Sequence, residues 1–238
     1  MLYPLLLVCG AVLLFLYIWE KIKAYSVKAV LLKSVVSMLF IMVGVYGTWL
    51  SALKGSTSPL CPFVVLGLLC GLLGDIWLDL KYVFPEKDAP FTYAGFCVFG
   101  VGHILYILGM LMTYYPSGKP ITVIVPVLLA LVLSIGNAVL EKPMKLIYGK
   151  FKPVVITYGV ILFAMVLISG RLALHYGWAK TPLNLIFIGG VFFAISDLIL
   201  SGTYFGKGRE RPIDLALNYI TYYAGQFLIA SALVFIGK

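Results

Sequence analysis

Eight apolar stretches, each about as long as a lipid bilayer is thick, dominate this chain of 238 residues. About 20 apolar residues cross a hydrocarbon core of roughly 30 Å as a helix. Irregular backbone and open sheet edges cannot face lipid, because their peptide groups would be left without hydrogen bonds. The pattern therefore predicts an all-α, polytopic membrane bundle of about eight transmembrane helices, with residues 1–238 in a single integral membrane domain. The predicted helices cover residues 2–19, 28–50, 61–80, 92–114, 120–140, 153–172, 182–203 and 213–236.

Only 11% of the residues are charged, and the basic ones are concentrated at one end of the predicted bundle. Thirteen of the 18 Lys and Arg residues lie in or beside the connections that follow the first, third, fifth and seventh predicted helices: Lys21, Lys23, Lys28, Lys33, Lys81, Lys87, Lys142, Lys145, Lys150, Lys152, Lys207, Arg209 and Arg211. The other five lie at the opposite end: Lys54, Lys119, Arg171, Lys180 and Lys238. Lys and Arg accumulate on the cytoplasmic side of membrane proteins. We therefore expect the odd connections in the cytoplasm and both termini on the non-cytoplasmic side of a cell membrane.

Several functional classes lack their motifs in this sequence. The net charge of +9 suits orientation in the membrane and contact with anionic lipid head groups, so no nucleic-acid partner is expected. Only two histidines are present, without HxxxH or HExxH spacing, and the four cysteines have no CxxC spacing. Neither a metal site nor a disulfide is therefore expected. There is no GxSxG elbow and no Walker-type phosphate loop, and we predict no cofactor.

Two pairs of predicted helices resemble each other, which suggests an internal duplication. The third, with LGLLCGLLGDIWLDL, is similar to the seventh, with FIGGVFFAISDLILSG, because in each small residues precede an aspartate. The helices that follow them match in GHILYI and GQFLIA. Asp75 lies 28 residues before His103, and Asp197 lies 29 residues before Gln226. Four helices per half give both halves the same orientation. Two four-helix parallel repeats are one interpretation, and chance likeness between apolar helices is the other. The repeats would span 1–115 and 116–238.

Polar side chains stand at depth inside several of the predicted helices. Asp75 and Asp197 each lie roughly 6–9 Å inside a helix end on the side of the odd connections, at 1.5 Å of rise per residue. His103 and Gln226 lie deeper, near mid-helix, and Lys33 lies about one turn inside the second helix. A charge in lipid is costly and is tolerated where it faces the bundle interior, a cavity or a partner. We therefore expect Asp75 and Asp197 to face one interior cavity.

These residues also have purely structural interpretations. Asp75 and Asp197 would be structural links if each only paired with Lys33 or with a Tyr hydroxyl. His103 would be a packing residue if its ring only filled the interior. Asp79, one turn after Asp75 and close to a basic connection, is interpreted as an interfacial charge.

The ordered set of motifs resembles one family of multipass membrane proteins. The segments AVLLKSV, LGLLCGLLGDIWL, FGVGHILYI, FFAISDLIL and YYAGQFLIA are similar to those of the YhhN-type lysoplasmalogenase family, from the second to the eighth predicted helix. The resemblance implies a hydrolase that cleaves the vinyl ether bond of lysoplasmalogens. Its products are a fatty aldehyde and a glycerophospho-base, either glycerophosphoethanolamine or glycerophosphocholine. The resemblance matches the family's two intramembrane aspartates to Asp75 and Asp197 and its histidine to His103. The connecting loops match poorly, so a head-group preference does not transfer.

The chemistry of this bond suits two carboxyl groups. A vinyl ether is cleaved by acid, because its remote alkene carbon takes a proton and water adds to the resulting oxocarbenium ion. Glycosidases use two carboxyl groups in a reaction with a similar, oxocarbenium-like transition state. We expect Asp75 and Asp197 to be the catalytic acid and base, in an order that the sequence leaves open. Six further residues are expected to bind substrate: Lys33, His103, Tyr106, Tyr158, Ser196 and Gln226.

The expected partners are a lysophospholipid substrate and membrane lipid. Lys33 and the basic rim are expected to hold the phosphate, because ammonium groups form strong hydrogen bonds to phosphate oxygens. Aliphatic side chains are expected to surround the hydrocarbon chain. The sequence does not predict an oligomeric state.

Two other functions fit the same aspartates. GLLGD resembles part of the G-x-G-D element of presenilin-like intramembrane aspartyl proteases, but its first glycine is offset and no YD motif precedes it. A non-enzymatic alternative is a small-solute or lipid transporter with proton-relay aspartates, which a duplicated chain would suit. Lipid turnover separates the enzyme from the transporter, and peptide cleavage identifies the protease.

Overall fold

The structure is a computed structural model that describes residues 2–206 and 211–237. Over those residues the prediction of an all-α bundle of eight helices is confirmed, and no sheet is present. The helices are α1 (Leu2–Lys23), α2 (Val27–Leu53), α3 (Leu60–Val83), α4 (Asp88–Tyr114), α5 (Ile121–Val139), α6 (Lys152–His175), α7 (Thr181–Phe205) and α8 (Pro212–Ala232). Short 3₁₀ turns are η1 (Pro85–Lys87), η2 (Gly149–Phe151) and η3 (Leu233–Phe235). Lys207, Arg209 and Lys238, which contribute to the charge asymmetry, lie outside the described residues.

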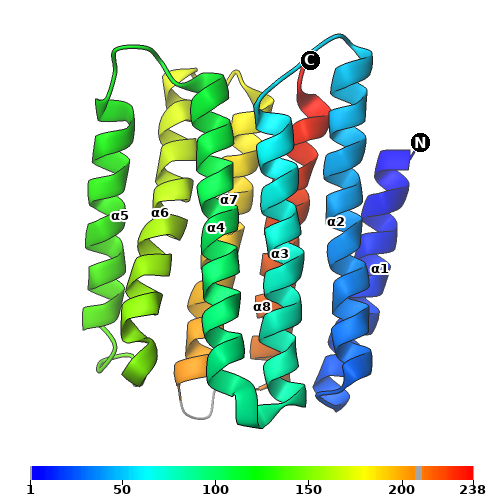
Figure 1. Cartoon of the computed structure of the whole chain (residues 1–238), viewed down its shortest axis with the longest axis vertical. Coiled ribbons are helices and arrows are strands. Elements are labelled where there is room, and N and C mark those ends of the chain that lie inside the picture. The colour runs from blue at the N-terminus through cyan, green and yellow to red at the C-terminus, as the bar shows by residue number, and fades with distance from the viewer. Residues whose placement is uncertain (1, 207–210, 238) are drawn as a thin grey trace.

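The helices stand side by side, and each runs opposite to the one before it (Figure 1). Helices α1, α3, α5 and α7 end at the same end of the bundle, where α2, α4, α6 and α8 begin. We call this the basic end, because most of the Lys and Arg residues lie there. The first and last described residues lie at the opposite end.

Helix α8 is the most enclosed of the helices, although it is the least apolar. Seven of the described helices are long and apolar enough to cross a membrane, and α8 is not among them. Its buried face carries several polar side chains: Asn218, Tyr219, Tyr222, Tyr223 and Gln226. Helices α1, α2, α3 and α7 pack against it. Polar groups on α8 therefore meet protein partners, which makes this composition tolerable inside a membrane bundle.

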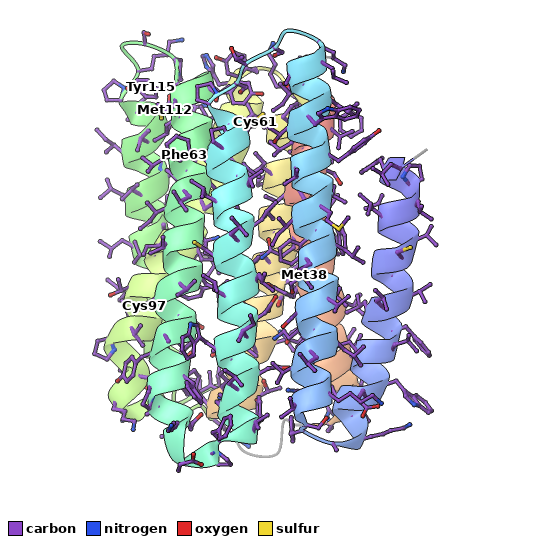
Figure 2. All side chains as sticks on the ribbon, turned by 45° about the vertical axis from the view of Figure 1, so that its right-hand side comes forward. Met38, Cys61, Phe63, Cys97, Met112 and Tyr115 are labelled. Atoms are coloured by element: carbon purple, nitrogen blue, oxygen red, sulfur yellow. The ribbon has the colours of Figure 1, made fainter. Side chains whose placement is uncertain are left out.

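Helix α5 lies at the edge of the bundle and has the opposite character (Figure 1). Its buried residues recur at every fourth position and form one stripe against α6: Thr122, Pro126, Ala130, Ser134 and Ala138. Most of its other side chains are exposed and aliphatic. Large apolar side chains are exposed elsewhere too, as at Met38 on α2 and Met112 on α4 (Figure 2). Such an exterior is expected of helices surrounded by lipid.

Two pairs of glycines allow neighbouring helices to approach each other closely. Gly67 on α3 faces Gly102 on α4, and a Cβ at Gly67 would lie 3.0 Å from the Gly102 carbonyl oxygen. Gly189 on α7 faces Gly225 on α8, and a Cβ at either would lie 2.7 Å from the carbonyl oxygen of the other. Small residues at such crossings let helix backbones pack together. A side chain at these positions would push the helices apart.

The two glycine pairs occupy corresponding places in the two halves of the chain. The first glycine of each pair lies eight positions before the aspartate of its helix, Asp75 or Asp197. The second lies directly before His103 or Gln226. The packing of α4 against α6 likewise corresponds to the packing of α8 against α2. The duplication stays a prediction, and these are contacts that it would produce.

The alternating helices predict which connections share a face of the membrane. Lys142 lies in the connection after α5, Lys180 lies directly before α7, and both side chains are exposed. A cysteine at either position, in a chain without the native cysteines, should react with a membrane-impermeant maleimide from opposite sides of sealed vesicles. Labelling of both positions from the same side would contradict the eight-helix topology.

Candidate active site

A cavity toward the basic end of the bundle is lined by both Asp75 and Asp197. Residues of six helices form the rest of its wall: Lys33, Leu78, Phe96, Phe99, Tyr158, Ser196, Leu200, Tyr204, Asn218, Tyr219 and Tyr222. The two aspartates come from α3 and α7 and are far apart in sequence. The fold therefore places them on one interior surface, which we call the aspartate cavity.

Asp75 is fully enclosed and receives three polar contacts. Its side chain is 2% exposed. The Lys33 Nζ lies 3.2 Å from its Oδ1. The Ser37 hydroxyl donates to its Oδ2 at 2.6 Å, and the Tyr222 hydroxyl donates to the same oxygen at 2.8 Å. A positive charge and two hydroxyl donors all stabilise a carboxylate in preference to a neutral carboxylic acid.

Asp79 is buried and paired, so its interpretation as an interfacial charge is wrong. Its side chain is 1% exposed. The Lys21 and Lys33 Nζ atoms lie 3.0 Å and 3.3 Å from its Oδ1, and the Tyr17 hydroxyl donates to its Oδ2 at 3.1 Å. The reason lies in α1, which runs a full turn beyond its predicted end and carries the Lys21 ammonium into the bundle beside α3.

Lys33 joins the two aspartates of α3 into one ionic cluster. Its ammonium contacts both carboxylates, while Lys21 contacts Asp79. The cluster therefore has two positive and two negative charges and no net charge. Removing charges from water is costly, and direct pairing offsets that cost. Lys33 lines the aspartate cavity, but a substrate phosphate there would have to compete with Asp75 and Asp79 for its ammonium.

The environment of Asp197 differs from that of Asp75 in its charge. Among the residues that the structure describes, its carboxylate has no Lys or Arg nitrogen within 4.0 Å. The side chain is partly buried, and its remaining surface faces two cavities. Its partner is Tyr158, whose hydroxyl donates to the Asp197 Oδ2. The two aspartates of the cavity therefore differ in the charge of their surroundings.

A chain of hydrogen bonds backs the Asp75 side of the cavity. Tyr222, which donates to Asp75, accepts a hydrogen bond from the Gln226 Nε2 at 3.1 Å. The Tyr106 hydroxyl donates to the Gln226 Oε1 at 3.2 Å. Gly71 leaves room for this amide, since a Cβ there would lie 2.6 Å from its Nε2. Tyr106 and Gln226 thus lie behind the cavity wall and are connected to it by hydrogen bonds through Tyr222.

His103 backs the Asp197 side in a similar way. Its Nε2 lies 3.3 Å from the hydroxyl of Tyr158, and its ring packs edge-on against Phe193 with centroids 4.6 Å apart. The side chain is 1% exposed and is not part of the cavity wall. With Tyr158 donating to Asp197, the hydrogen-bond network assigns the proton of a neutral His103 to Nε2. His103 therefore contacts the cavity only through the hydroxyl of Tyr158.

Three of the six residues expected to bind substrate line the cavity: Lys33, Tyr158 and Ser196. Ser196 is held from α8, because the Asn218 Nδ2 donates to its carbonyl oxygen at 2.8 Å and to its hydroxyl at 3.0 Å. These bonds fix α7 next to α8 at the level of the aspartates. The other three expected residues lie behind the cavity wall: His103 behind Tyr158, and Tyr106 and Gln226 behind Tyr222.

A second, apolar pocket adjoins the aspartate cavity beside Asp197. The two spaces share five lining residues: Phe96, Tyr158, Asp197, Leu200 and Tyr204. The rest of the pocket wall comes from α5, α6 and α7 and is mostly aliphatic and aromatic, including Val155, Leu162, Phe163 and Leu198. Asp197 therefore stands where a polar cavity meets an apolar pocket.

Four residues that hold the aspartates were not singled out in the sequence: Tyr17, Lys21, Ser37 and Tyr222. Helical spacing is the signal that could have found them, because residues four positions apart lie on the same face of a helix. Ser37 lies four positions after Lys33, and Tyr222 lies four positions before Gln226. Lys21 lies four positions after Tyr17, but nothing in α1 alone shows that it faces Asp79.

Comparison with known protein families places most of the chain in one of them. The model of the YhhN family matches residues 28–233. This range includes both aspartates of the cavity and all of α2 to α8 except the first residue of α2. The chain belongs to the YhhN family. The resemblance of its motifs is thereby confirmed. No curated protein and no solved structure is significantly similar to the chain. In this YhhN-family chain, Lys21 of the ionic cluster lies outside the matched range, and so does Tyr17, which donates a hydrogen bond to Asp79.

The ionic cluster predicts different stabilities for two aspartate variants. Asp79→Asn leaves two ammonium groups facing a single carboxylate, and removing one partner of a buried ion pair costs about 3–5 kcal/mol. Asp197→Asn removes no ionic contact among the described residues and keeps an acceptor for the Tyr158 hydroxyl. In detergent, thermal unfolding of the Asp79 variant should therefore begin well below that of the wild type, and the Asp197 variant should unfold near it. Equal losses in both variants would contradict the role of the cluster.

Proposed function

We propose that this protein is an ether hydrolase of the lysoplasmalogenase type. It cleaves the vinyl ether bond of a lysoplasmalogen to a fatty aldehyde and a glycerophospho-base. The observation that carries the proposal is the cavity in which Asp75 and Asp197 face the same space with different charge partners. Membership in the YhhN family supports it. The proposed setting is a cell membrane, with the termini on the non-cytoplasmic side and a lysophospholipid from the surrounding lipid as substrate.

Hydrolysis of a vinyl ether requires an acid and a base in the same site. The acid protonates the alkene carbon that is remote from oxygen, which is the difficult step. The base then deprotonates the water that adds to the oxygen-bearing carbon. Efficient catalysis needs a carboxylic acid that is still protonated at the working pH beside a carboxylate that is not.

The surroundings of the two aspartates suggest which role each has. Asp75 contacts the Lys33 ammonium and two hydroxyl donors, and these stabilise a carboxylate. Asp197 has no such cation within 4.0 Å among the described residues, and an apolar pocket adjoins it. A carboxyl group in apolar surroundings without a compensating charge is held neutral. We therefore assign Asp197 as the acid and Asp75 as the base. Tyr158 donates to Oδ2 of Asp197, which leaves Oδ1 to carry the proton.

The proposed steps return both aspartates to their starting states. Asp197 gives its proton to the remote alkene carbon, and the ether becomes an oxocarbenium ion. Asp75 takes a proton from water as the water oxygen bonds to the oxygen-bearing carbon, giving a hemiacetal. The hemiacetal hydroxyl then returns a proton to Asp197. Asp75 protonates the departing glycerol oxygen as the carbon–oxygen bond breaks, which releases the aldehyde.

The apolar pocket is suited to the hydrocarbon chain of the substrate. Its aliphatic and aromatic wall begins at Asp197 and extends among α5, α6 and α7. A chain in this pocket would bring the first carbons of the alkenyl group next to the Asp197 carboxyl. The glycerol and phosphate would then extend through the aspartate cavity toward the basic end.

Conversion of either aspartate to asparagine should abolish most of the cleavage. Asn keeps the size of Asp but cannot exchange the catalytic proton, and acid–base groups typically contribute about 10²–10⁴-fold. We expect purified wild-type protein to release aldehyde from a lysoplasmalogen and not from its ester-linked analogue. Asp75→Asn and Asp197→Asn should each lose roughly 10²-fold or more, and the double variant should be little worse, because the groups act as a unit. In D₂O, the aldehyde should carry one deuterium on the carbon next to the carbonyl.

Glu86→Gln is a matched control, since Glu86 is an exposed carboxylate in η1 at the same end of the bundle. It should retain full turnover. Near-normal turnover in either folded Asp→Asn variant would contradict the two-aspartate mechanism and leave the structural-link interpretation. Cleavage of a transmembrane peptide without lipid turnover would identify the protease, and uptake without turnover would identify the transporter.

The two histidines should differ in their effect on turnover. His103 orients Tyr158 beside the acid, whereas His175 ends α6 at the opposite end of the bundle. His103→Ala should therefore lower kcat by about tenfold or more, within the range of acid–base effects, and His175→Ala should leave it unchanged. Tyr158→Phe should reproduce the effect of His103→Ala, since both act through the same hydroxyl. Equal losses at His103 and His175 would show that His103 is a packing residue.

A further inference from the structure

An ion pair stands between two hollows at the basic end of the bundle. The Lys81 Nζ, on α3, lies 3.3 Å from the Asp88 Oδ1, at the start of α4. One hollow lies toward η2 and includes Thr92 and Lys150 in its wall. The other lies toward α1 and includes Tyr25 and Tyr82. Lys81 and Asp88 line both hollows.

Tyr204 connects this ion pair to the aspartate cavity. Its ring lines the aspartate cavity, the apolar pocket and both hollows. The Lys81 Nζ lies 3.4 Å from the centroid of the same ring. A molecule held at Asp75 and Asp197 therefore needs only to pass Tyr204 to reach Lys81.

The separation along the helices suits a lysophospholipid. Lys81 lies six positions after Asp75, which corresponds to about 9 Å of rise along α3. In a lysoplasmalogen, five covalent bonds separate the vinyl ether oxygen from phosphorus, which is roughly 6 Å when extended. The flexible side chain of Lys81 covers the remaining distance. A substrate with its vinyl ether at the aspartates thus has its phosphate within reach of Lys81.

We propose that Lys81 and Asp88 form the binding site for a zwitterionic head group, and this rests on the proposed function. The Lys81 ammonium, with Lys150, binds the phosphate in the hollow toward η2. Asp88 binds the ammonium of the head group in the hollow toward α1. Lys81 then exchanges the Asp88 carboxylate for the substrate phosphate. Asp88 exchanges the Lys81 ammonium for the substrate ammonium. Binding of both groups together gives each protein charge a substrate partner, whereas a phosphate without an ammonium takes Lys81 from Asp88 and gives Asp88 nothing in exchange.

The phosphate half of the site has a rigid wall. The Lys81 side chain is only 10% exposed, so its charge is weakly screened by solvent. The connection that carries Lys150 is fixed by Glu141, which pairs with Lys152 at 2.8 Å and accepts from the Tyr148 backbone N–H at 2.7 Å. The same two contacts hold the pKa of the Glu141 carboxyl below its ordinary value, so this anchor persists at neutral pH.

The ammonium half combines a carboxylate with aromatic rings. The Thr92 hydroxyl donates to the Asp88 Oδ1 at 3.3 Å and orients it. The rings of Tyr25 and Tyr82 stack with centroids 4.3 Å apart and already face a cation, since the Lys21 Nζ lies 4.8 Å and 4.4 Å from them. Aromatic faces of this kind bind both primary and quaternary ammonium groups.

Kinetics on three substrates with one alkenyl chain tests the site. The head groups are phosphoethanolamine, phosphate alone, and none, as in the free alkenylglycerol. Loss of a hydrogen bond to a charged group corresponds to roughly ten- to hundredfold in binding. Lys81→Gln should therefore raise KM at least tenfold for both phosphate-bearing substrates and leave the KM for the alkenylglycerol unchanged. Asp88→Asn should raise KM for the phosphoethanolamine substrate and lower it for the phosphate substrate, with kcat little changed in each case.

Lys87→Gln and Glu86→Gln are matched controls, because both residues are exposed in the adjoining 3₁₀ turn. They should leave all three KM values unchanged. Equal effects of Lys81→Gln on the three substrates, or no effect on any, would contradict the proposed site. So would an Asp88→Asn variant that handles both phosphate-bearing substrates alike.

Binding of a saturated 1-O-alkyl lysophosphoethanolamine separates this proposal from the proposed function, since that ether cannot be protonated at an alkene carbon. Calorimetry should show at least tenfold weaker binding to Lys81→Gln and to Asp88→Asn than to the wild type. Weaker binding to both variants, without any vinyl ether turnover by the wild type, would contradict the proposed function and support the head-group site. Turnover by the wild type with equal binding to all variants would overturn the site and keep the function.

Discussion

The contact of the Lys33 ammonium with Asp75 and Asp79 is the interaction on which the rest of the structure depends. Charges inside a membrane bundle are tolerated only when they are paired, and here one ammonium is shared by two carboxylates of α3. The pairing requires α2 beside α3, and the second ammonium, from Lys21, requires α1 there as well. It also explains the polar face of α8, because Tyr222 completes the coordination of Asp75. The same contact supplies the charge that distinguishes Asp75 from Asp197.

The difference between the two aspartates is clearest when the two halves of the chain are compared. Lys33 stands 42 positions before Asp75, and the residue 42 positions before Asp197 is Val155. Lys33 pairs with its aspartate, whereas Val155 lines the apolar pocket next to Asp197. On the predicted duplication, one copy kept a cation and the other an aliphatic side chain at the same place. An acid and a base would then arise from one ancestral helix pair, because the surroundings of a carboxyl group set its protonation.

The helices and the shared cavity were predictable, because lipid thickness fixes helix length and intramembrane aspartates must face the interior. The environment of each carboxylate was not. The closeness of Asp79 to a basic connection predicts an interfacial charge, and only the path of α1 brings Lys21 to it. His103 lies at the predicted depth, yet its ring faces Tyr158 rather than the cavity. Depth follows from counting along one helix, whereas side-chain partners depend on how several helices are rotated against one another.

The charge states of the two aspartates in the folded protein test this account most directly. Infrared difference spectra between H₂O and D₂O show the C=O stretch of a protonated carboxyl group, which a carboxylate lacks. The wild type and Asp75→Asn should both show this band near neutral pH, and Asp197→Asn should lose it. Loss of the band in Asp75→Asn, with the band retained in Asp197→Asn, would contradict the assignment of Asp197 as the neutral acid and Asp75 as the charged base.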